Sequence, residues 1–263
     1  MSGPAGGAPP LALRAHWKDV VEGVRASSRV AFFLDLDGTL APLTPRPEQA
    51  RVPAETKEVL RRLAAHRKAT VTVISGRRRA VLERLVRVPD VQCWGLYGAE
   101  TRGDFSLRAA ERRALGRARE ELVKRIPRST GIWIEDKRAS LSVHLRGVRE
   151  PLRLPVRRAV RMLAHVLRRD LRLIENLHDA ELVPRRVGGK GEAVRRYLAR
   201  RKRGSKLLAV YCGDDYSDEP AFAAVAGGVA ILVGPERRTR ARFRLPSPGE
   251  LTQALRDFEE ILP

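Results

Sequence analysis

The chain has 263 residues, which is enough for one large domain or for a core domain with a smaller one. Its formal net charge is +21, but only eight of the 52 basic residues are lysines and the arginines occur in every segment, so charge alone does not indicate a nucleic-acid surface. No apolar stretch approaches the ~18 residues of a membrane span, and the N-terminus lacks the basic and apolar regions of a secretory signal, so we expect a cytoplasmic protein with no membrane association.

The N-terminal part of the chain predicts helices that alternate with buried strands. Residues 30–37, VAFFLDLD, form a continuous apolar run that ends in acid and glycine, which is typical of a strand buried on both faces of a parallel sheet. In chain order we expect a disordered tail over 1–10, an amphipathic helix over 11–27, a strand over 30–37, a helix over 54–66, a strand over 69–74, and a helix that Ser75 caps.

The C-terminal part resumes the same alternation. We expect a helix over 191–200, a strand over 207–212, a helix over 219–226, a strand over 229–233, and a last helix that ends near 261. Ser247 followed by proline, glycine and glutamate predicts the cap of that last helix. Residues 11–101 and 187–263 are therefore predicted to form one Rossmann-like α/β core with a parallel sheet.

The middle of the chain predicts a different arrangement. It contains a helical pattern over 106–125, alternating strand patterns over 131–135 and 140–145, a helical pattern over 150–168, and two short strands over 171–175 and 180–184. An α-β-β-α-β-β order suits a small antiparallel sheet backed by helices. We therefore expect residues 102–186 to be an α+β cap domain inserted into the core.

Two carboxylates follow the first buried strand. Asp35 and Asp37 in DLDGTL are expected to point to the same side, at the carboxyl end of a strand, where open α/β sheets bind ligands. Gly38 allows a sharp turn there, and Thr39 offers a hydroxyl group to an anion. A polar strand end with an ordinary turn would produce the same letters, so this motif alone does not decide the function.

Three further motifs come at later strand or helix ends. Ser75, in ISGR, can donate a hydroxyl group to phosphate, and Lys190, in GGKG at a helix start, can neutralise a phosphate oxygen. The loop CGDDYSDE contains Asp214, Asp215 and Asp218, and carboxylates are the ligands that Mg²⁺ prefers. Each motif alone is weak, and the Walker phosphate-loop pattern is absent.

In this order the four motifs resemble the signature of the haloacid dehalogenase-like phosphohydrolases. The resemblance implies that Asp35 attacks phosphorus and that Asp37 protonates the leaving oxygen and then activates water. It implies that Thr39, Ser75 and Lys190 bind the transferring phosphoryl group. It also implies a Mg²⁺ ion held by Asp35, the backbone carbonyl of Asp37, and Asp214, with Asp215 or Asp218 in support.

A narrower resemblance, to the trehalose-6-phosphate phosphatases, lies in WIEDKRASLSVHLR at 133–146, GLYGAE at 95–100 and ELVP at 181–184. It implies that sugar contacts come from Glu135, Lys137, His144 and Glu181, with Gly76, Arg77 and Gly98 also binding substrate. The alternative is an exposed charged sheet face on which His144 merely packs. Tyr97 and Val183 depart from the family, which often has histidine and a basic residue there.

We therefore predict a magnesium-dependent phosphatase that acts on trehalose 6-phosphate through an aspartyl phosphate, works as a monomer and has a small sugar phosphate as its partner. One alternative is the same chemistry on sucrose phosphate or a glycosylglycerate phosphate. Another is a basic nucleic-acid-binding protein on a degenerate phosphatase scaffold, which the 5% aromatic content disfavours. Cys93 and Cys212 are expected to be buried free thiols.

Overall fold

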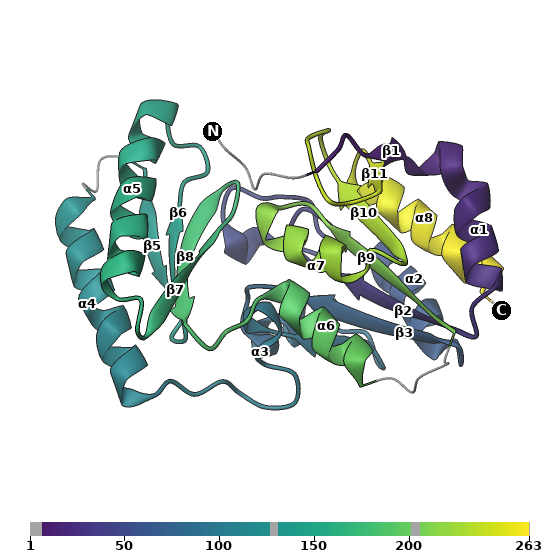
Figure 1. Ribbon diagram of the computed structural model, residues 1–263, viewed down its shortest axis with the longest axis horizontal. Helices are drawn as coiled ribbons and strands as arrows, with labels where there is room; N and C mark the ends of the chain where they lie inside the picture. Colours follow the sequence, from purple (N-terminus) through teal and green to yellow (C-terminus); the bar gives the residue numbers. More distant parts are fainter. Residues whose placement is uncertain (1–6, 127–130, 201–205, 263) are drawn as a thin grey trace. The chain divides into compact units, whose positions relative to one another are not determined.

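The computed structural model describes residues 7–126, 131–200 and 206–262 (Figure 1). These residues divide into two compact units, one formed by the chain up to residue 101 and from 189 onward, the other by 102–188. The tail predicted over 1–10 lies partly outside the described residues. Within the described part, Ala8 forms an antiparallel bridge with Thr239.

The larger unit contains a sheet in which all paired strands are parallel, in the order β1-β11-β10-β9-β2-β3-β4. The strands are β1 (Leu11–Ala12), β2 (Arg29–Leu34), β3 (Ala69–Ile74), β4 (Gln92–Trp94), β9 (Leu207–Gly213), β10 (Val229–Val233) and β11 (Phe243–Leu245). β2 pairs with both β3 and β9, so the strand that leads to Asp35 lies inside the sheet. The predicted α/β fold with a parallel sheet is confirmed.

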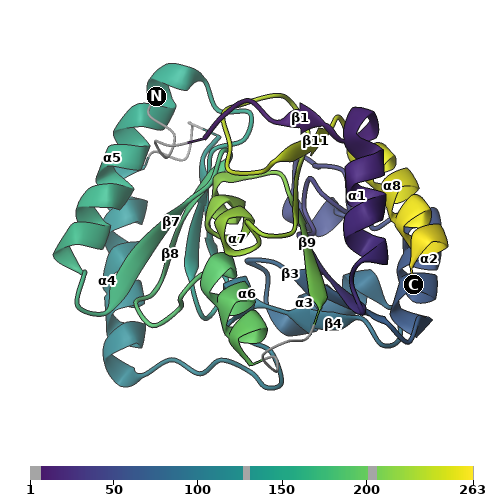
Figure 2. The same cartoon turned by 45° about the vertical axis from the view of Figure 1, so that its right-hand side comes forward.

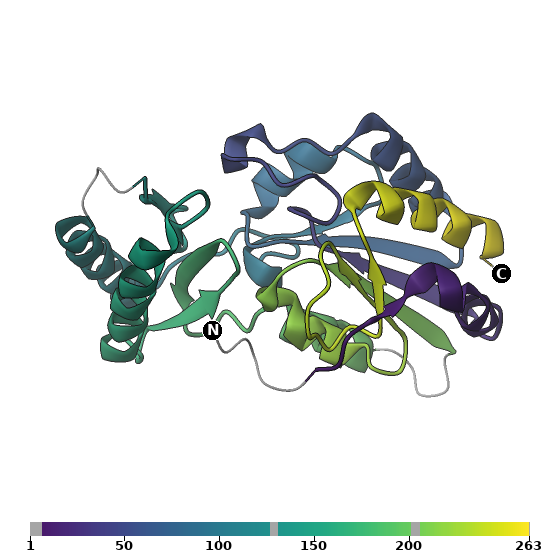
Figure 3. The same cartoon turned by 90° about the horizontal axis from the view of Figure 1, so that it is seen from above.

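Helices cover both faces of this sheet because successive strand side chains alternate sides. Phe32 belongs to a core shared with α1 (Trp17–Arg25), α2 (Ala54–Ala65), α3 (Arg79–Val86) and α8 (Pro248–Ile261). Phe33 belongs to the opposite core, shared with α6 (Lys190–Ala199) and α7 (Glu219–Ala224). Figure 2 shows α1 beside α8, and Figure 3 shows the yellow α8 and the green α6 and α7 on opposite sides of the sheet.

The smaller unit is an antiparallel sheet with the order β5-β6-β8-β7, backed by α4 and α5 (Figure 1). Its elements are α4 (Ala109–Arg125), β5 (Trp133–Asp136), β6 (Leu141–His144), α5 (Glu150–Val166), β7 (Leu171–Glu175) and β8 (Asp179–Pro184). Leu141, Val143 and Leu182 pack with both helices in one apolar core. Ser142 and Glu181 pair across β6 and β8 on the other face, so that face of the sheet is polar.

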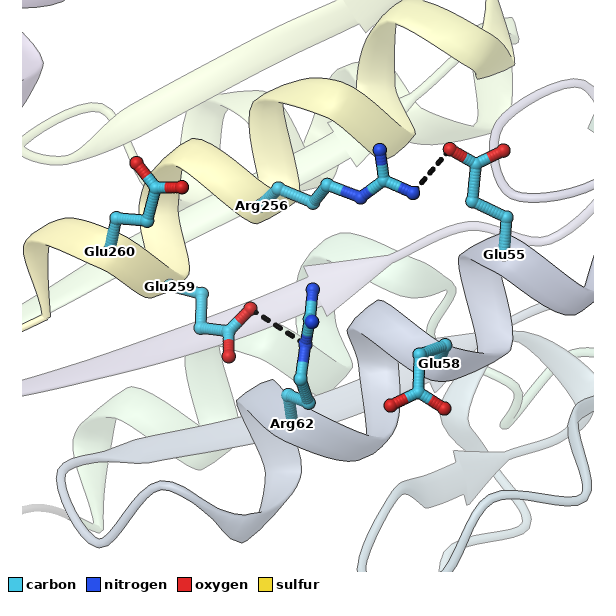
Figure 4. Close-up of a pocket in the computed structure, with 6 residues that line it drawn as sticks. All are labelled: Glu55, Glu58, Arg62, Arg256, Glu259 and Glu260. Atoms are coloured by element: carbon cyan, nitrogen blue, oxygen red, sulfur yellow. Dashed lines mark hydrogen bonds and ion pairs between the residues drawn. The ribbon is translucent and has the colours of Figure 1, made fainter.

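A groove of about 530 Å³ runs between α2 and α8 (Figure 4). It is lined only by charged side chains, which are Glu55, Glu58, Arg62, Arg256, Glu259 and Glu260. Arg62 Nε lies 3.0 Å from Glu259 Oε2, and Arg256 pairs with Glu55. Partly exposed pairs of this kind contribute about 0–1 kcal/mol each. The groove joins two helices and contains none of the predicted catalytic residues.

Two predicted helix starts are wrong. The segment that begins at Leu11 first forms strand β1, paired with β11, and then a 3-10 turn, η1 (Leu13–His16), before α1 begins. Ser75 does not cap α3, which begins at Arg79 after an extended Arg78. Ser75 Oγ instead accepts the backbone N–H of Arg77 at 3.2 Å. By contrast, Ser247 caps α8 as predicted, because its hydroxyl accepts the N–H of Glu250.

Candidate active site

Asp35 extends the line of β2 by one residue. Its backbone N–H donates to the carbonyl of Cys212 at 2.9 Å, so pairing with β9 continues to this position. The residue is only 4% exposed, and Oδ1 accepts a hydrogen bond from Lys190 Nζ at 2.7 Å. Burial of the carboxylate, together with the nearby Asp218 and Asp37, raises the pKa of Asp35 to about 7 even though Lys190 opposes this. The strand therefore presents a desolvated carboxylate at its carboxyl end.

Lys190 is the first residue of α6 and follows Gly189, whose φ of +90° suits glycine. Its ammonium group donates to Asp35 Oδ1 at 2.7 Å and to Asp218 Oδ1 at 2.8 Å, and the residue is 4% exposed. Burial alone would lower the pKa of Lys190, but Asp218 and Asp35 together raise it above its ordinary value. The lysine thus stays charged and links two carboxylates from different strand ends.

Asp218 is held by three donors. Besides Lys190, the hydroxyl of Tyr211 donates to Oδ1 at 2.6 Å and the backbone N–H of Asp215 donates to Oδ2 at 3.0 Å. The side chain of Asp215 accepts the N–H of Tyr216 and caps the 3-10 turn η5 (Tyr216–Asp218). Asp218 therefore bonds to Lys190, and Asp215 caps η5.

Asp35, Asp214 and Asp218 each place a carboxylate oxygen within 4.8 Å of the others. Oδ1 of Asp214 is buried and has no hydrogen-bond partner among the described residues. Burial, with Asp35 next in effect, raises the pKa of Asp214 well above its ordinary value. A Cβ on Gly38 would lie 2.1 Å from Asp214 Oδ2, so the absence of a side chain there lets this carboxylate approach the DLDGTL turn. Such a set of hard oxygen donors with an unsatisfied charge fits a Mg²⁺ ion.

Asp37 faces a different partner. Arg77 Nε and Nη2 donate to its two carboxylate oxygens at 2.7 Å each, and Nη2 also donates to the carbonyl of Pro47 at 2.8 Å. The Asp37 carboxylate is not part of the three-acid cluster. Because β2 ends at Leu34, strand alternation does not determine the direction of the Asp37 side chain. The contact between Asp37 and Arg77 was not predicted from the sequence.

Thr39 and Ser75 are the predicted hydroxyl donors near these acids. Thr39 is fully buried, and its Oγ1 has no hydrogen-bond partner among the described residues. Ser75 is buried at the end of β3, where its N–H donates to the carbonyl of Trp94 at 3.1 Å. A buried hydroxyl with an unused donor is suited to an anion that arrives from solution.

The glycines at 76 and 98 are explained by packing. A Cβ on Gly76 would lie 2.7 Å from Cζ of Tyr97, and one on Gly98 would lie 2.3 Å from Cβ of Ala193 in α6. Gly98 also has φ +90°, and Tyr97 itself is left-handed with φ +56° in the short turn η3 (Leu96–Gly98). These contacts account for both glycines without a substrate, so their predicted role in substrate binding remains a prediction.

The four predicted sugar contacts lie in the smaller unit and form two hydrogen-bonded pairs. His144 Nε2 and Glu135 Oε2 are 2.9 Å apart, and Lys137 Nζ donates to Glu181 Oε2 at 2.8 Å. Burial would lower the pKa of Lys137, but Glu181, Asp179 and Glu135 raise it, so this lysine is charged. His144 stacks on Trp133, with ring centroids 4.2 Å apart, and this contact was not predicted from the sequence.

Tyr211 is a site residue that the motifs did not indicate. It lies in β9, among apolar residues, and its buried hydroxyl reaches Asp218. Burial, with Asp218 next in effect, raises the pKa of this phenol above its ordinary value. The available signal was a lone tyrosine in an apolar strand, because a buried hydroxyl needs a partner.

Solved structures share this parallel sheet with helices on both faces. A haloacid dehalogenase-like hydrolase from Bacteroides thetaiotaomicron shares the fold with a TM-score of 0.59 and 14% identity, over 88% of this chain and 99% of that one. The C-terminal domain of the C. albicans trehalose-6-phosphate phosphatase has a TM-score of 0.82 and 21% identity, over 97% of this chain and 100% of that one.

The model of the trehalose-phosphatase family matches residues 33–248, so this chain belongs to that family. A trehalose-phosphate phosphatase of Mycobacterium avium is 35% identical over 252 residues, which cover 88% of this chain and 63% of the relative. An uncharacterized glycosyl hydrolase of Mycobacterium tuberculosis is 36% identical over 242 residues, which cover 86% of this chain but only 18% of the relative. The chain thus spans less than two thirds of these relatives. Among the described residues, no helix has the length and apolarity needed to cross a membrane.

Proposed function

We propose that this chain is a magnesium-dependent phosphatase that hydrolyses trehalose 6-phosphate to trehalose and phosphate through an aspartyl phosphate on Asp35. The observation that carries the proposal is the contact set around Asp35, a buried carboxylate bonded to Lys190 and within 4.8 Å of Asp214 and Asp218 oxygens. Membership of the trehalose-phosphatase family supports the same reaction.

Asp35 is the proposed nucleophile. Its Oδ1 is fixed by Lys190 Nζ at 2.7 Å, and this bond orients the carboxylate so that its other oxygen can attack phosphorus. When bound by Asp35, Asp214, the Asp37 carbonyl and the supporting Asp218, Mg²⁺ supplies positive charge that offsets the repulsion between a carboxylate and a phosphate dianion. Thr39 and Ser75 would donate hydroxyl groups to the phosphoryl oxygens.

Asp37 is the proposed acid and base. As the bond between phosphorus and the sugar oxygen breaks, Asp37 gives that oxygen its proton. In the second step Asp37 takes a proton from water, whose oxygen attacks phosphorus and releases the Asp35 carboxylate. In the structure both Asp37 oxygens accept bonds from Arg77, so one of these bonds must break before Asp37 can carry the proton that it donates. The remaining bond would orient Asp37, so Arg77 acts as a positioning residue in this scheme.

The sugar is proposed to be bound by Glu135, Lys137, His144 and Glu181 of the 102–188 unit, which we infer to be a cap. Their two hydrogen-bonded pairs are acids with bases, and such groups both donate to and accept from sugar hydroxyls. The M. avium relative is named a trehalose-phosphate phosphatase, which favours trehalose 6-phosphate. A different sugar phosphate is the second candidate substrate, because Tyr97 and Val183 depart from the family pattern.

A phosphate-release assay on a panel of phosphosugars tests the proposal. We expect trehalose 6-phosphate to exceed sucrose phosphate and a glycosylglycerate phosphate in kcat/KM, and EDTA to abolish release until Mg²⁺ is restored. Asp35→Asn should abolish turnover and keep the circular dichroism spectrum of the parent. A stronger preference for another sugar would overturn the substrate, and turnover by Asp35→Asn would overturn the mechanism.

A further inference from the structure

Arg237 contacts the backbone of the acidic loop, the segment from Asp214 to Asp218. It lies after β10, and its Nη2 donates to the backbone carbonyls of Asp214 at 3.3 Å and Asp215 at 3.1 Å. Its guanidinium carbon also lies 5.0 Å from the centroid of the Tyr216 ring. The arginine therefore contacts three consecutive residues of the segment that carries the cation-binding acids.

Glu219 fixes this arginine in turn. Its Oε1 accepts from Arg237 Nη1 at 2.5 Å and from Thr239 Oγ1 at 2.7 Å, and its Oε2 accepts the N–H of Arg240 at 2.8 Å. Glu219 is 4% exposed and is the first residue of α7, where a negative charge is favoured by the helix dipole. The guanidinium is thus held at one end by a buried carboxylate and at the other by two carbonyls.

The acidic loop needs this support because the side chain of Asp214 is held by few hydrogen bonds. Lys190 holds Asp35 and Asp218, but Oδ1 of Asp214 has no hydrogen-bond partner among the described residues. The position of this carboxylate near Asp35 therefore depends on its backbone, and Arg237 fixes the orientation of that backbone from the carbonyl side.

We propose that Arg237 and Glu219 form a positioning pair that holds the Asp214–Asp215 segment in the conformation that binds a divalent cation. This inference rests on the proposed function, because the pair supports the metal site of the same reaction. Groups that orient metal ligands without touching the metal typically change affinity by about 10–100-fold when they are mutated.

The charge of Arg237 allows positioning to be separated from electrostatics. If the arginine acted only through its charge, its removal would leave the acidic site more negative and Mg²⁺ would bind more tightly. If it positions the loop, its removal weakens Mg²⁺ binding in spite of the charge. Glu219→Gln removes a negative charge and also loosens Arg237, so it should weaken binding as well. Lysine at 237 keeps the charge but lacks the planar donor geometry that serves both carbonyls and Glu219.

The experiment is a calorimetric titration of the metal-free full chain with Mg²⁺, repeated with Mn²⁺ by electron paramagnetic resonance. We expect Arg237→Gln to raise the Kd for Mg²⁺ by about 10-fold or more, Arg237→Lys to raise it less, and Asp214→Asn to abolish binding. Arg238→Gln is the matched control, because Arg238 is exposed and donates to the carbonyl of Gly7. It should bind Mg²⁺ as the parent does.

Tighter or unchanged Mg²⁺ binding by Arg237→Gln would overturn the proposal. If that variant does not fold, as judged by thermal melting in EDTA, Arg237→Lys and Glu219→Gln decide, and parental affinity in both would overturn it. Absence of Mg²⁺ binding in the parent would also overturn it. Because the titration requires no turnover, its outcome is independent of whether the chain releases phosphate from trehalose 6-phosphate, so the two proposals can fail separately.

Discussion

Lys190 lies between two buried carboxylates, and its removal would leave Asp35 and Asp218 facing each other without a counter-charge. Breaking a buried ion pair by removing one partner typically costs about 3–5 kcal/mol. We expect Lys190→Met to lower the free energy of unfolding by about this amount in EDTA, as measured by urea denaturation, and Mg²⁺ to restore part of the loss. Lys18→Met, at an exposed position, is the control. Equal stability of the two variants would contradict the arrangement.

Asp37 allows a test that separates the two chemical steps. General acid and base catalysis is worth about 10²–10⁴-fold, so Asp37→Asn should reduce turnover of a sugar phosphate by that order. Nitrophenyl phosphate has a leaving group that needs no proton. With this substrate, the variant should release a rapid burst of nitrophenol equal in concentration to the enzyme, followed by slow turnover. Stopped-flow absorbance measures both phases. A slow linear release with no burst would argue against a base role for Asp37.

For single residues, the motifs allowed the residues of the site to be predicted, but not the side chains that these residues contact. The short patterns DLDGTL and GDDYSD placed Asp35, Asp214 and Asp218 at strand ends that a parallel sheet brings together. The pairing of Asp37 with Arg77 and the contact of Arg237 with the acidic loop depend on the conformation of irregular segments. Sequence periodicity carries no information about such segments.

At the scale of elements, the start of α4 depends on an acid buried under an arginine. Glu111 accepts the N–H of Arg108 at 2.8 Å, and Arg186 Nε donates to Glu111 Oε1 at 2.7 Å. Burial would raise the pKa of Glu111, but the bonds from Arg186 and Arg108 lower it below its ordinary value. A lowered pKa in the folded state means that the stabilisation is present above the unfolded pKa and is lost as the pH falls.

We therefore expect Glu111→Gln to destabilise the chain at pH 7 by about 1–3 kcal/mol, which is typical of a hydrogen bond to a charged group. The difference from the parent should shrink at an acid pH below the lowered pKa of Glu111, where the parent also carries a protonated carboxyl group. Urea denaturation at both values measures it, with the exposed Glu120→Gln as a control on the same helix. A difference that persists unchanged in acid would show that the carboxylate charge is not involved.

The elements that could be predicted were the ones with strong local patterns. β3, β7 and β10 have the predicted bounds because each is a short apolar or alternating run between polar segments. β1, β4 and β11 were missed because each has only two or three residues and exists by pairing with distant segments. Ser75 was wrongly predicted to cap α3, because the sequence after it suits a loop as well as a helix start. In the structure this loop continues to Arg78 and the helix begins at Arg79.

At the scale of the whole molecule, the formal net charge of +21 favours weak binding of any polyanion. We expect binding of a DNA or RNA oligomer, measured by fluorescence anisotropy, to weaken steeply as salt rises, while Mg²⁺-dependent phosphate release from a sugar phosphate persists. Nanomolar oligomer binding at physiological salt without phosphate release would instead support a nucleic-acid-binding protein on a phosphatase scaffold.

The order of elements allowed the type of each sheet to be predicted, because a helix after each buried strand leads to a parallel sheet and an interrupting α-β-β-α-β-β run leads to a second, antiparallel sheet. The reason for so many arginines could not be predicted. The structure explains particular ones, including Arg77, Arg186 and Arg237, through buried or half-buried acids that they contact.

In the proposed reaction the phosphoryl group is bonded covalently to Asp35 before water releases it as phosphate. The most direct measurement is acid quenching during turnover of trehalose 6-phosphate with Mg²⁺, followed by peptide mass spectrometry. The peptide with Asp35 should gain the mass of one phosphoryl group, alkali should remove that group, and Asp35→Asn should never acquire it. A phosphoryl group on any other residue, or full turnover by the Asp35→Asn variant, would contradict the proposed reaction.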